Sequence, residues 1–276
     1  MAEYIIETRN LSFEYSDGTK ALKNVNLKIK KGKKIAFIGV NGSGKSTLFL
    51  NLNGVLKPSE GNVIFKGKEI KYNQRELNNI RKSIGIVFQD PENQIFSASV
   101  YQEVSFGAMN LKLTKEEVIR RVDKALKDTD VYSYKDKAVH FLSYGQKKRV
   151  SIADILVMEP EVIVFDEPTS SLDPKHSLEL VDIFDNINRD GMTVIISTHD
   201  VELAYSWADY IFVMKDGKVE KEGSPYEIFS DDKLLESCYL QKPLILEVYE
   251  NMLASGKLEA SVKIPRNKKE LLEIIN

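Results

Sequence analysis

Polar and apolar residues alternate over the first part of the chain, as they do in β-strands that bury one face. The pattern runs through YIIETRNLSFEY at residues 4–15 and NVNLKIKKGKKIAFIG at residues 24–39. From Lys112 to Lys127 the apolar residues instead recur with helical spacing, and Thr114 and Glu117 have the spacing of a capping box. We therefore expect the section from about 90 to 158 to be mostly helical.

Strand-like apolar runs return after this section, as EVIVFDE at residues 161–167 and MTVIIST at residues 192–198. A helical stretch lies between them and should end at Gly191, which suits a C-cap. The sequence KDGKV at residues 215–219 is a hairpin turn signal. Strands that alternate with helices predict an α/β fold with a largely parallel sheet, into which the helical section is inserted.

A further helix start lies in FLSYGQKKR at residues 141–149. Ser143 is followed three positions later by Gln146, which is the spacing of a capping box. The apolar residues after it recur at roughly helical spacing: Val150, Ile152, Ile155, Leu156 and Met158. The N-terminal end of such a helix favours an anion, but this stretch alone does not say which one.

Composition excludes several classes of function. The chain has 39 basic and 41 acidic residues, so the near-zero net charge argues against a dedicated nucleic-acid binder. Its apolar runs are shorter than the roughly 20 residues that cross a bilayer, so we expect a cytosolic chain unless a partner holds it at a membrane. One cysteine and three scattered histidines give no transition-metal cluster.

The sequence GVNGSGKST at residues 39–47 is a glycine-rich phosphate loop between a predicted strand and a predicted helix. The glycines allow the backbone to curl around a polyphosphate, Lys45 brings positive charge to the terminal phosphates, and Ser46 offers an oxygen to Mg²⁺. The predicted nucleotide-binding residues of the loop are Gly39, Asn41, Gly42, Ser43, Gly44, Lys45, Ser46 and Thr47.

Two consecutive acids end the strand-like run VIVFDE. Asp166 is placed to help hold Mg²⁺, and Glu167 is the candidate to orient and deprotonate a water that attacks the γ-phosphate of ATP. Two adjacent acids at the end of a buried strand would be costly without a purpose. The pair therefore predicts ATP hydrolysis rather than phosphate binding alone.

The order of the phosphate loop, LSYGQ at 142–146, the DE pair, SLDP at 171–174 and STHD at 197–200 resembles the ATP-binding subunits of ABC transporters. The resemblance covers residues 1 to about 222. It implies a P-loop NTPase core with a mainly parallel sheet, an antiparallel β subdomain and an inserted helical subdomain at about 90–158. Residues 223–276 would form a small C-terminal extension.

The same resemblance implies roles for residues outside the loop. Ser143, Gly145 and Gln146 would face the γ-phosphate of an ATP held by the opposite subunit, although Tyr144 replaces the usual glycine. The other matching residues are Tyr15 for stacking on adenine, Gln89 for sensing Mg²⁺ and water, His199 for the γ-phosphate, and Asp173 for linking the two sites.

The segments QDPENQIF at 89–96 and SVYQEVSFG at 99–107 resemble energy-coupling-factor transporters, including cobalt import ATPases. This implies a homodimer, or a heterodimer with a related ATPase, on the cytoplasmic face of the membrane. The implied partners are a transmembrane scaffold and a substrate-binding membrane protein. We expect the scaffold to dock beside the segment after Gln89, where Asp90, Glu92 and Glu103 suit a basic helix.

Other interpretations stay open. In the tail, an apolar helical face of Leu244, Val248, Met252 and Leu253 suits a dimer contact or a helix folded back on its own domain, and Pro265 precedes another short helix. Cobalt follows from the resemblance alone, and a vitamin is the alternative substrate. A soluble ABC ATPase of translation or DNA repair is a weaker alternative, because the chain has neither a second ATPase unit nor a long coiled coil.

Overall fold

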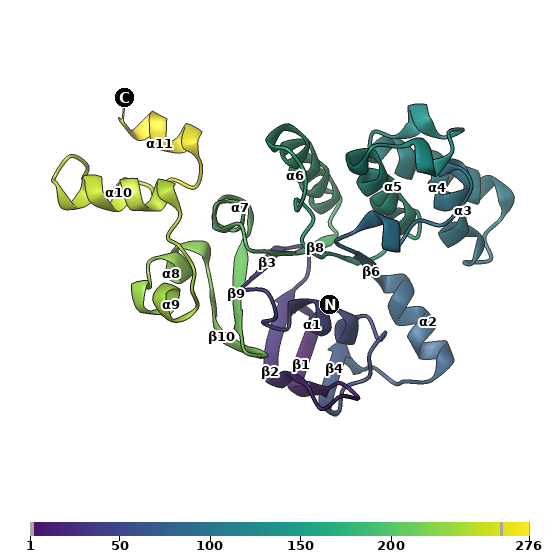
Figure 1. Ribbon diagram of the computed structural model, residues 1–276, viewed down its shortest axis with the longest axis horizontal. Coiled ribbons are helices and arrows are strands. Elements are labelled where there is room, and N and C mark those ends of the chain that lie inside the picture. Colours follow the sequence, from purple (N-terminus) through teal and green to yellow (C-terminus); the bar gives the residue numbers. More distant parts are fainter. Residues whose placement is uncertain (1–2, 260–261, 276) are drawn as a thin grey trace.

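The computed structural model describes residues 3–259 and 262–275, in which the strands form two sheets (Figure 1). The first sheet is antiparallel, with the order β2-β1-β4-β5. Its strands are β1 (Tyr4–Glu14), β2 (Lys20–Lys30), β4 (Glu60–Phe65) and β5 (Lys68–Glu69). The alternating N-terminal pattern therefore forms strands, as predicted.

The second sheet has the order β10-β9-β3-β8-β7-β6 and is parallel except for β10. Its strands are β3 (Lys34–Ile38), β6 (Ile84–Val87), β7 (Val162–Phe165), β8 (Thr193–Thr198), β9 (Tyr210–Lys215) and β10 (Lys218–Gly223). The predicted hairpin joins β9 to β10, and Asp216 and Gly217 both have the positive φ of a type I′ turn. The expected parallel sheet is confirmed.

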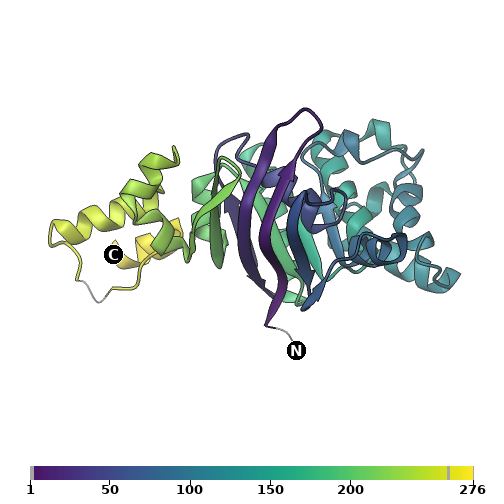
Figure 2. The ribbon, with the colours of Figure 1, turned by 90° about the horizontal axis from the view of Figure 1, so that it is seen from below.

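Both faces of the parallel sheet are covered, which explains why its strands are continuous apolar runs. In β3, Ile35 and Phe37 belong to the core shared with the antiparallel sheet and α1 (Lys45–Leu52). Ala36 and Ile38 belong to the opposite core, with α6 (Pro174–Arg189) and α7 (Val201–Trp207). Another helix, α2 (Gln74–Ser83), adds Ile80 to the first core. Figure 2 shows the antiparallel sheet between the helical section and the tail.

The helical section lies beside β6, at one side of the molecule (Figure 1). It consists of α3 (Val100–Met109), α4 (Lys115–Asp128), α5 (Tyr144–Leu156) and the short 3₁₀ helices η1 (Pro91–Asn93), η2 (Tyr132–Tyr134) and η3 (Val139–Phe141). The capping box at the start of α5 is confirmed: Ser143 Oγ accepts from Gln146 N–H, and Gln146 Oε1 accepts from Ser143 N–H.

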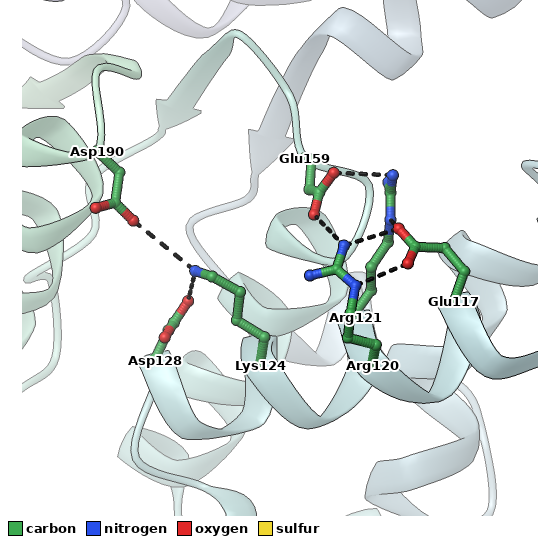
Figure 3. A network of polar contacts seen from close by, with 7 residues as sticks. All are labelled: Glu117, Arg120, Arg121, Lys124, Asp128, Glu159 and Asp190. Carbon is green, nitrogen blue, oxygen red and sulfur yellow. Dashed lines mark hydrogen bonds and ion pairs between the residues drawn. The ribbon is translucent and has the colours of Figure 1, made fainter.

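The second predicted capping box forms only in part. Thr114 caps α4 by accepting from Glu117 N–H at 3.3 Å, and the helix begins at Lys115 rather than at Lys112. The Glu117 carboxylate instead accepts from Arg120 and Arg121, each at 2.7 Å, and these hydrogen bonds lower its pKa to about 2 (Figure 3). Two guanidinium groups outcompete one backbone N–H for the carboxylate.

The same face of α4 is joined to the parallel-sheet core by ion pairs (Figure 3). Arg121 lies 2.8 Å from Glu159, in the loop that follows α5, and Arg120 lies 3.3 Å from the other oxygen of that carboxylate. Lys124 pairs with Asp128 on α4 and lies 3.8 Å from Asp190, which follows α6. This network connects the helical section to the end of α6.

The tail contains α8 (Pro225–Phe229), α9 (Asp232–Ser237), α10 (Leu244–Ala254) and α11 (Lys268–Ile275), so the helix expected after Pro265 is present. Leu246 and Tyr249, on the inner face of α10, are buried in the main core. On the expected apolar face, Leu244 is 63% exposed and Val248, Met252 and Leu253 are only partly buried. That face therefore points outward, and its role as a dimer contact stays a prediction.

The tail is held against α7 by polar contacts as well. Tyr205 donates its hydroxyl to the Pro265 carbonyl at 2.9 Å, and the Arg266 guanidinium donates to the carbonyls of Tyr205 and Ala208. Tyr249 donates to the Val262 carbonyl at 3.0 Å. The interpretation of α10 as a helix folded back on its own domain therefore describes its inner face.

Glu103 does not belong to an exposed acidic surface, contrary to expectation. Its side chain is fully buried, and Oε2 accepts from the backbone N–H groups of Phe96 and Ser97 at 3.0 and 2.6 Å. Because these groups precede α3, the carboxylate holds the loop that leads into that helix. Phe96 and Phe106, 68% and 50% exposed and in edge-to-face contact, dominate the nearby surface instead.

A second acid, Asp154, lies near Glu103 inside the helical section. Asp154 accepts a hydrogen bond from Gln94 Nε2 at 3.3 Å. Burial, reinforced by the Glu103 charge, raises the pKa of Asp154 to about 7, although the Gln94 hydrogen bond opposes the shift. The folded state therefore keeps this carboxyl protonated at pH values where the unfolded chain ionises it.

We expect Asp154→Asn to stabilise the protein more at pH 8 than at pH 5. The stability that protonated Asp154 contributes is complete below the unfolded pKa of 3.8 and is lost as the pH rises towards 7. Asparagine cannot ionise, so its advantage in free energy of unfolding should grow by about 2 kcal/mol between the two pH values. Denaturant unfolding measures this difference. An equal effect at both pH values, matching the exposed control Asp182→Asn, would contradict it.

Candidate functional site

The phosphate loop follows β3 and leads into α1, as predicted. A Cβ at Gly39 would lie 2.1 Å from the Met214 carbonyl oxygen, and a Cβ at Gly44 would lie 2.7 Å from that of Ala21. Both glycines also have positive φ, so neither position accepts a side chain. The tight approach of neighbouring backbone thus fixes the curl of the loop.

Lys45 points back into this loop and is only 6% exposed. Its Nζ donates to the carbonyls of Gly39 at 2.7 Å and Val40 at 3.3 Å, and it lies 3.9 Å from Glu167 Oε1. Burial lowers the pKa of Lys45, while the charges of Glu167 and Asp166 raise it. The ammonium group is held where a polyphosphate in the loop would meet it.

The two acids after β7 are fixed by a residue that the sequence analysis did not identify. Ser197, in β8, donates its hydroxyl to Asp166 Oδ1 at 2.5 Å and accepts from Glu167 N–H at 2.8 Å. Glu167 has φ 44°, a left-handed conformation that costs a non-glycine residue about 1–2 kcal/mol. The hydrogen bond from its N–H helps to hold that conformation. The sequence did contain a hint, because Ser197 is the second-last residue of a predicted strand and lies two residues before His199.

Glu167 is 9% exposed, and its two carboxylate oxygens have different surroundings. Oε2 lies 2.9 Å from His199 Nδ1, which suits an N–H donated to the carboxylate. Oε1 is buried and has no hydrogen-bond partner among the described residues. This oxygen has Lys45 Nζ as an ion-pair partner at 3.9 Å but makes no hydrogen bond with a described residue, so it is free to accept a proton or a hydrogen bond from a bound molecule. The His199 side chain, 68% exposed, stands at the rim of this site.

Gln89 reaches the same site from the end of β6. Its side-chain amide donates to Ser170 Oγ at 3.1 Å, and its backbone carbonyl accepts from Tyr144 and Lys148 of α5. Lys148 is buried, and burial lowers its pKa to about 8. None of Ser170, Tyr144 and Lys148 was assigned a role from the sequence. Only the position of Lys148 in the sequence hinted at a role. This lysine lies four residues after Tyr144 and close to apolar positions of α5.

The phosphate loop, Gln89 and the two acids line one cleft of about 440 Å³. Its lining includes Asn41, Gly42, Ser43, Gly44, Lys45, Ser46 and Thr47 of the loop, together with Tyr15, Gln89, Asp166 and Glu167. The Ser43 hydroxyl is a second buried polar atom with no hydrogen-bond partner among the described residues. Ser46, Gln89 and Asp166 bring a hydroxyl, an amide and a carboxylate together, and these oxygens fit Mg²⁺.

Tyr15 lies at the edge of this cleft. Its ring is 39% exposed and contacts Phe13 edge to face, and its hydroxyl is within 2.9 Å of Thr47 Oγ1. The hydroxyl is thereby fixed against the phosphate loop while part of the ring stays exposed. This arrangement leaves an aromatic surface for a flat ring to stack on.

The remaining predicted residues lie outside the cleft lining. Ser143 and Gln146 cap α5, and Asp173 caps α6 by accepting from His176 N–H at 3.0 Å. A Cβ at Gly145 would come within 3.8 Å of the Leu172 and His176 side chains, so the start of α5 packs beside the start of α6. A single chain therefore brings Ser143, Gly145 and Asp173 near one another, but not to the phosphate loop.

Comparison with known proteins agrees with this geometry. The family described as ABC transporter matches residues 22–170, from β2 through the phosphate loop and the two acids to Ser170. The chain belongs to the ABC transporter family of ATPases. The family assignment indicates ATP binding, and the geometry offers a cleft whose lining includes the two acids that follow β7.

Individual relatives cover most of the chain. The energy-coupling factor transporter ATP-binding protein EcfA of Methanocaldococcus jannaschii is 50% identical over 247 residues, which are 90% of this chain and 88% of that protein. The structure of cbiO1 from Clostridium perfringens, described as part of the ABC transporter complex cbiONQ, has a TM-score of 0.78 and 49% identity and covers 90% of this chain and 100% of its own.

A third comparison concerns assembly. The dimeric structure of the ATP-binding cassette MJ0796, bound to ADP and Pi, has a TM-score of 0.73 and 33% identity and covers 80% of this chain and 98% of its own. One relative, from Methanosarcina mazei, is longer: a match of 51% identity spans 91% of this chain and 56% of that protein. Among the described residues of this ABC ATPase, no helix is both long and apolar enough to cross a membrane.

Replacing Ser197 with alanine tests whether this hydroxyl positions the two acids. The change leaves an acid oxygen and the Glu167 N–H without their partner in a buried site, which typically costs about 1–3 kcal/mol. We expect ATP hydrolysis to fall about tenfold, corresponding to about 1.4 kcal/mol, with ATP affinity within threefold of wild type. The exposed Ser206→Ala change in α7 is the matched control. Unchanged turnover in Ser197→Ala would show that the acids are positioned without it.

Proposed function

We propose that this chain is the ATP-hydrolysing subunit of an energy-coupling-factor type importer. The observation that supports hydrolysis is that Glu167 Oε1, beside the phosphate loop and 3.9 Å from Lys45 Nζ, is buried without a hydrogen bond from any described residue. The importer class is supported by 50% identity to an energy-coupling factor transporter ATP-binding protein over 90% of this chain. A soluble ABC ATPase of translation or repair is the less favoured alternative.

At the site, the loop residues Gly39 to Thr47 bind the phosphates of ATP, and Lys45 neutralises charge at the terminal phosphate. Ser46, Asp166 and Gln89 would hold Mg²⁺, which supplies positive charge for the developing negative charge on the phosphoryl oxygens when bound. Ser197 keeps Asp166 in place for this task. Tyr15 presents its exposed ring to the adenine.

Glu167 serves as the general base. Its Oε1 accepts the proton of a water that attacks the γ-phosphate, while Oε2 stays paired with His199. His199 orients the carboxylate and contacts the γ-phosphate from the rim. Gln89 orients the same water from the end of the neighbouring strand β6, and its link to Ser170 holds the side-chain amide at the cleft.

The site is completed by a second subunit. Ser143, Gly145 and Gln146 form the exposed N-terminal turn of α5, whose N–H groups favour an anion, yet they do not line the cleft of their own chain. Placed against the γ-phosphate on a partner, this turn closes the site, and Asp173 beside it links the two sites. The dimeric MJ0796 relative bound to ADP and Pi supports this assembly.

The membrane partners are a transmembrane scaffold and a substrate-binding protein, which hold this chain at the cytoplasmic face of the membrane. The scaffold docks beside η1 and α3, where Phe96 and Phe106 are exposed and Glu92 lines the same hollow as Phe96. The tail contributes to the dimer contact through the outer face of α10, where Leu244 is exposed. The partner ATPase is a second copy or a related subunit.

Cobalt is the proposed substrate, and a vitamin is the alternative. The structural neighbour CbiO1, part of the ABC transporter complex cbiONQ, supports the choice of this class of importer. Among the described residues, no group of three or more His, Cys, Asp or Glu side chains could hold a metal ion. Substrate selection is therefore assigned to the substrate-binding membrane protein rather than to this chain.

Replacing Glu167 with glutamine tests the hydrolytic role. Glutamine keeps the shape of the side chain but cannot take the proton, so single-turnover hydrolysis should fall about 10²- to 10⁴-fold while ATP binding is retained. A variant that keeps more than about a third of the wild-type rate would place the base elsewhere. In cells that depend on this importer, the same variant should abolish uptake of radioactive Co²⁺. Loss of vitamin uptake with unchanged Co²⁺ uptake would favour the alternative substrate.

A further inference from the structure

Two side chains of α5 hold the backbone at Gln89. Lys148 Nζ donates to the carbonyls of Phe88 at 2.8 Å and Gln89 at 2.7 Å, and the Tyr144 hydroxyl donates to the Gln89 carbonyl at 3.2 Å. Residues four apart share one face of a helix, so both donors approach from the same side. The segment that follows β6 is thus attached directly to the first two turns of α5.

Further contacts extend this attachment along the chain. Lys147 pairs with Glu92 at 2.5 Å, and Gln94 Nε2 donates to the Ser151 carbonyl at 2.8 Å. These contacts differ in burial: Glu92 is 63% exposed, whereas Lys148 is 1% exposed. The carbonyl contacts of Lys148 are therefore the inner part of the attachment, and the Lys147–Glu92 pair is the outer part.

The burial of Lys148 needs an explanation. An ammonium group loses its hydration when buried, and an apolar side chain at the same position would avoid that cost. In return, Lys148 satisfies two carbonyls that a continuous strand or helix would otherwise satisfy. One of them belongs to Gln89, whose side chain lines the nucleotide cleft and donates to Ser170. Gln89 thus faces the cleft with its side chain and α5 with its backbone.

We propose that Lys148 and Tyr144 are positioning residues that fix Gln89 relative to the N-terminal turn of α5, Ser143 to Gln146, which we call the signature turn. The tyrosine that replaces the usual glycine of the signature supplies the second donor. Through this link, Gln89, which lines the cleft of its own chain, moves together with the turn at Ser143, which the same chain presents to its partner. The inference rests on the two-subunit site proposed above.

The consequence is a split between binding and turnover. Neither side chain lines the phosphate-loop cleft, so ATP binding to the loop should not depend on them. The alignment of Gln89 and of the partner-facing turn should depend on both. A residue with a merely structural role would instead lower the stability, the ATP affinity and the turnover of the protein together.

The test compares Lys148→Met and Tyr144→Phe with Lys147→Met, which breaks only the outer ion pair. We expect Lys148→Met to lower kcat at least tenfold, with KM and directly measured ATP affinity within threefold of wild type. Tyr144→Phe keeps the ring of this partly buried residue, removes one hydrogen bond and should lower kcat about 2- to 12-fold. Lys147→Met should stay within twofold. Hydrogen exchange in Lys148→Met should rise in residues 88–94, and Lys148→Arg should recover part of the rate.

Three results would overturn the proposal. The first is a kcat within twofold of wild type in both Lys148→Met and Tyr144→Phe. The second is a parallel loss of thermal stability, ATP affinity and kcat in both variants. The third is an effect of Lys147→Met as large as that of Lys148→Met. Each is read against a wild-type enzyme that hydrolyses ATP and an inactive Glu167→Gln variant. If wild type itself did not hydrolyse ATP, the proposed function would fail instead.

Discussion

The arrangement of the site depends on one buried pair of opposite charges at the end of the parallel sheet. Lys45 and Glu167 are 6% and 9% exposed, and their charged atoms lie 3.9 Å apart. A buried charge without a partner is strongly destabilising, so each of these side chains requires the other, or a ligand, in the same place. The adjacent parallel strands β3, β8 and β7 satisfy this requirement, because their carboxyl ends lie at one edge. They lead to the phosphate loop, to His199 and to the two acids.

The features predicted correctly from the sequence are those that short segments determine. The phosphate loop, the I′ hairpin at Asp216 and the capping box of Ser143 depend on residues within a few positions of one another. The strand pattern also fixed the parallel sheet, since β3 and β7 are too apolar to leave either face exposed.

The features that the sequence did not predict depend on contacts between distant segments. The burial of Leu246 and Tyr249 on α10 was not predicted, because only the position of the core decides which side of that helix faces inward. Glu103 was predicted to be a surface acid because the backbone N–H groups that donate to its carboxylate belong to a loop, and the sequence does not predict the path of that loop. Ser197 went unassigned because its partners come from another strand, 31 and 30 residues away.

In the dimer that we propose, the cleft of one chain is completed by the signature turn of another. The most direct measurement mixes Lys45→Ala chains with Ser143→Arg chains, each inactive alone, and isolates the mixed dimer with two tags. In that dimer one composite site carries both changes and the other carries neither. We expect ATP to be trapped at the intact site and hydrolysis to return if one site suffices for turnover. A mixed dimer that neither traps nor hydrolyses ATP would contradict this arrangement.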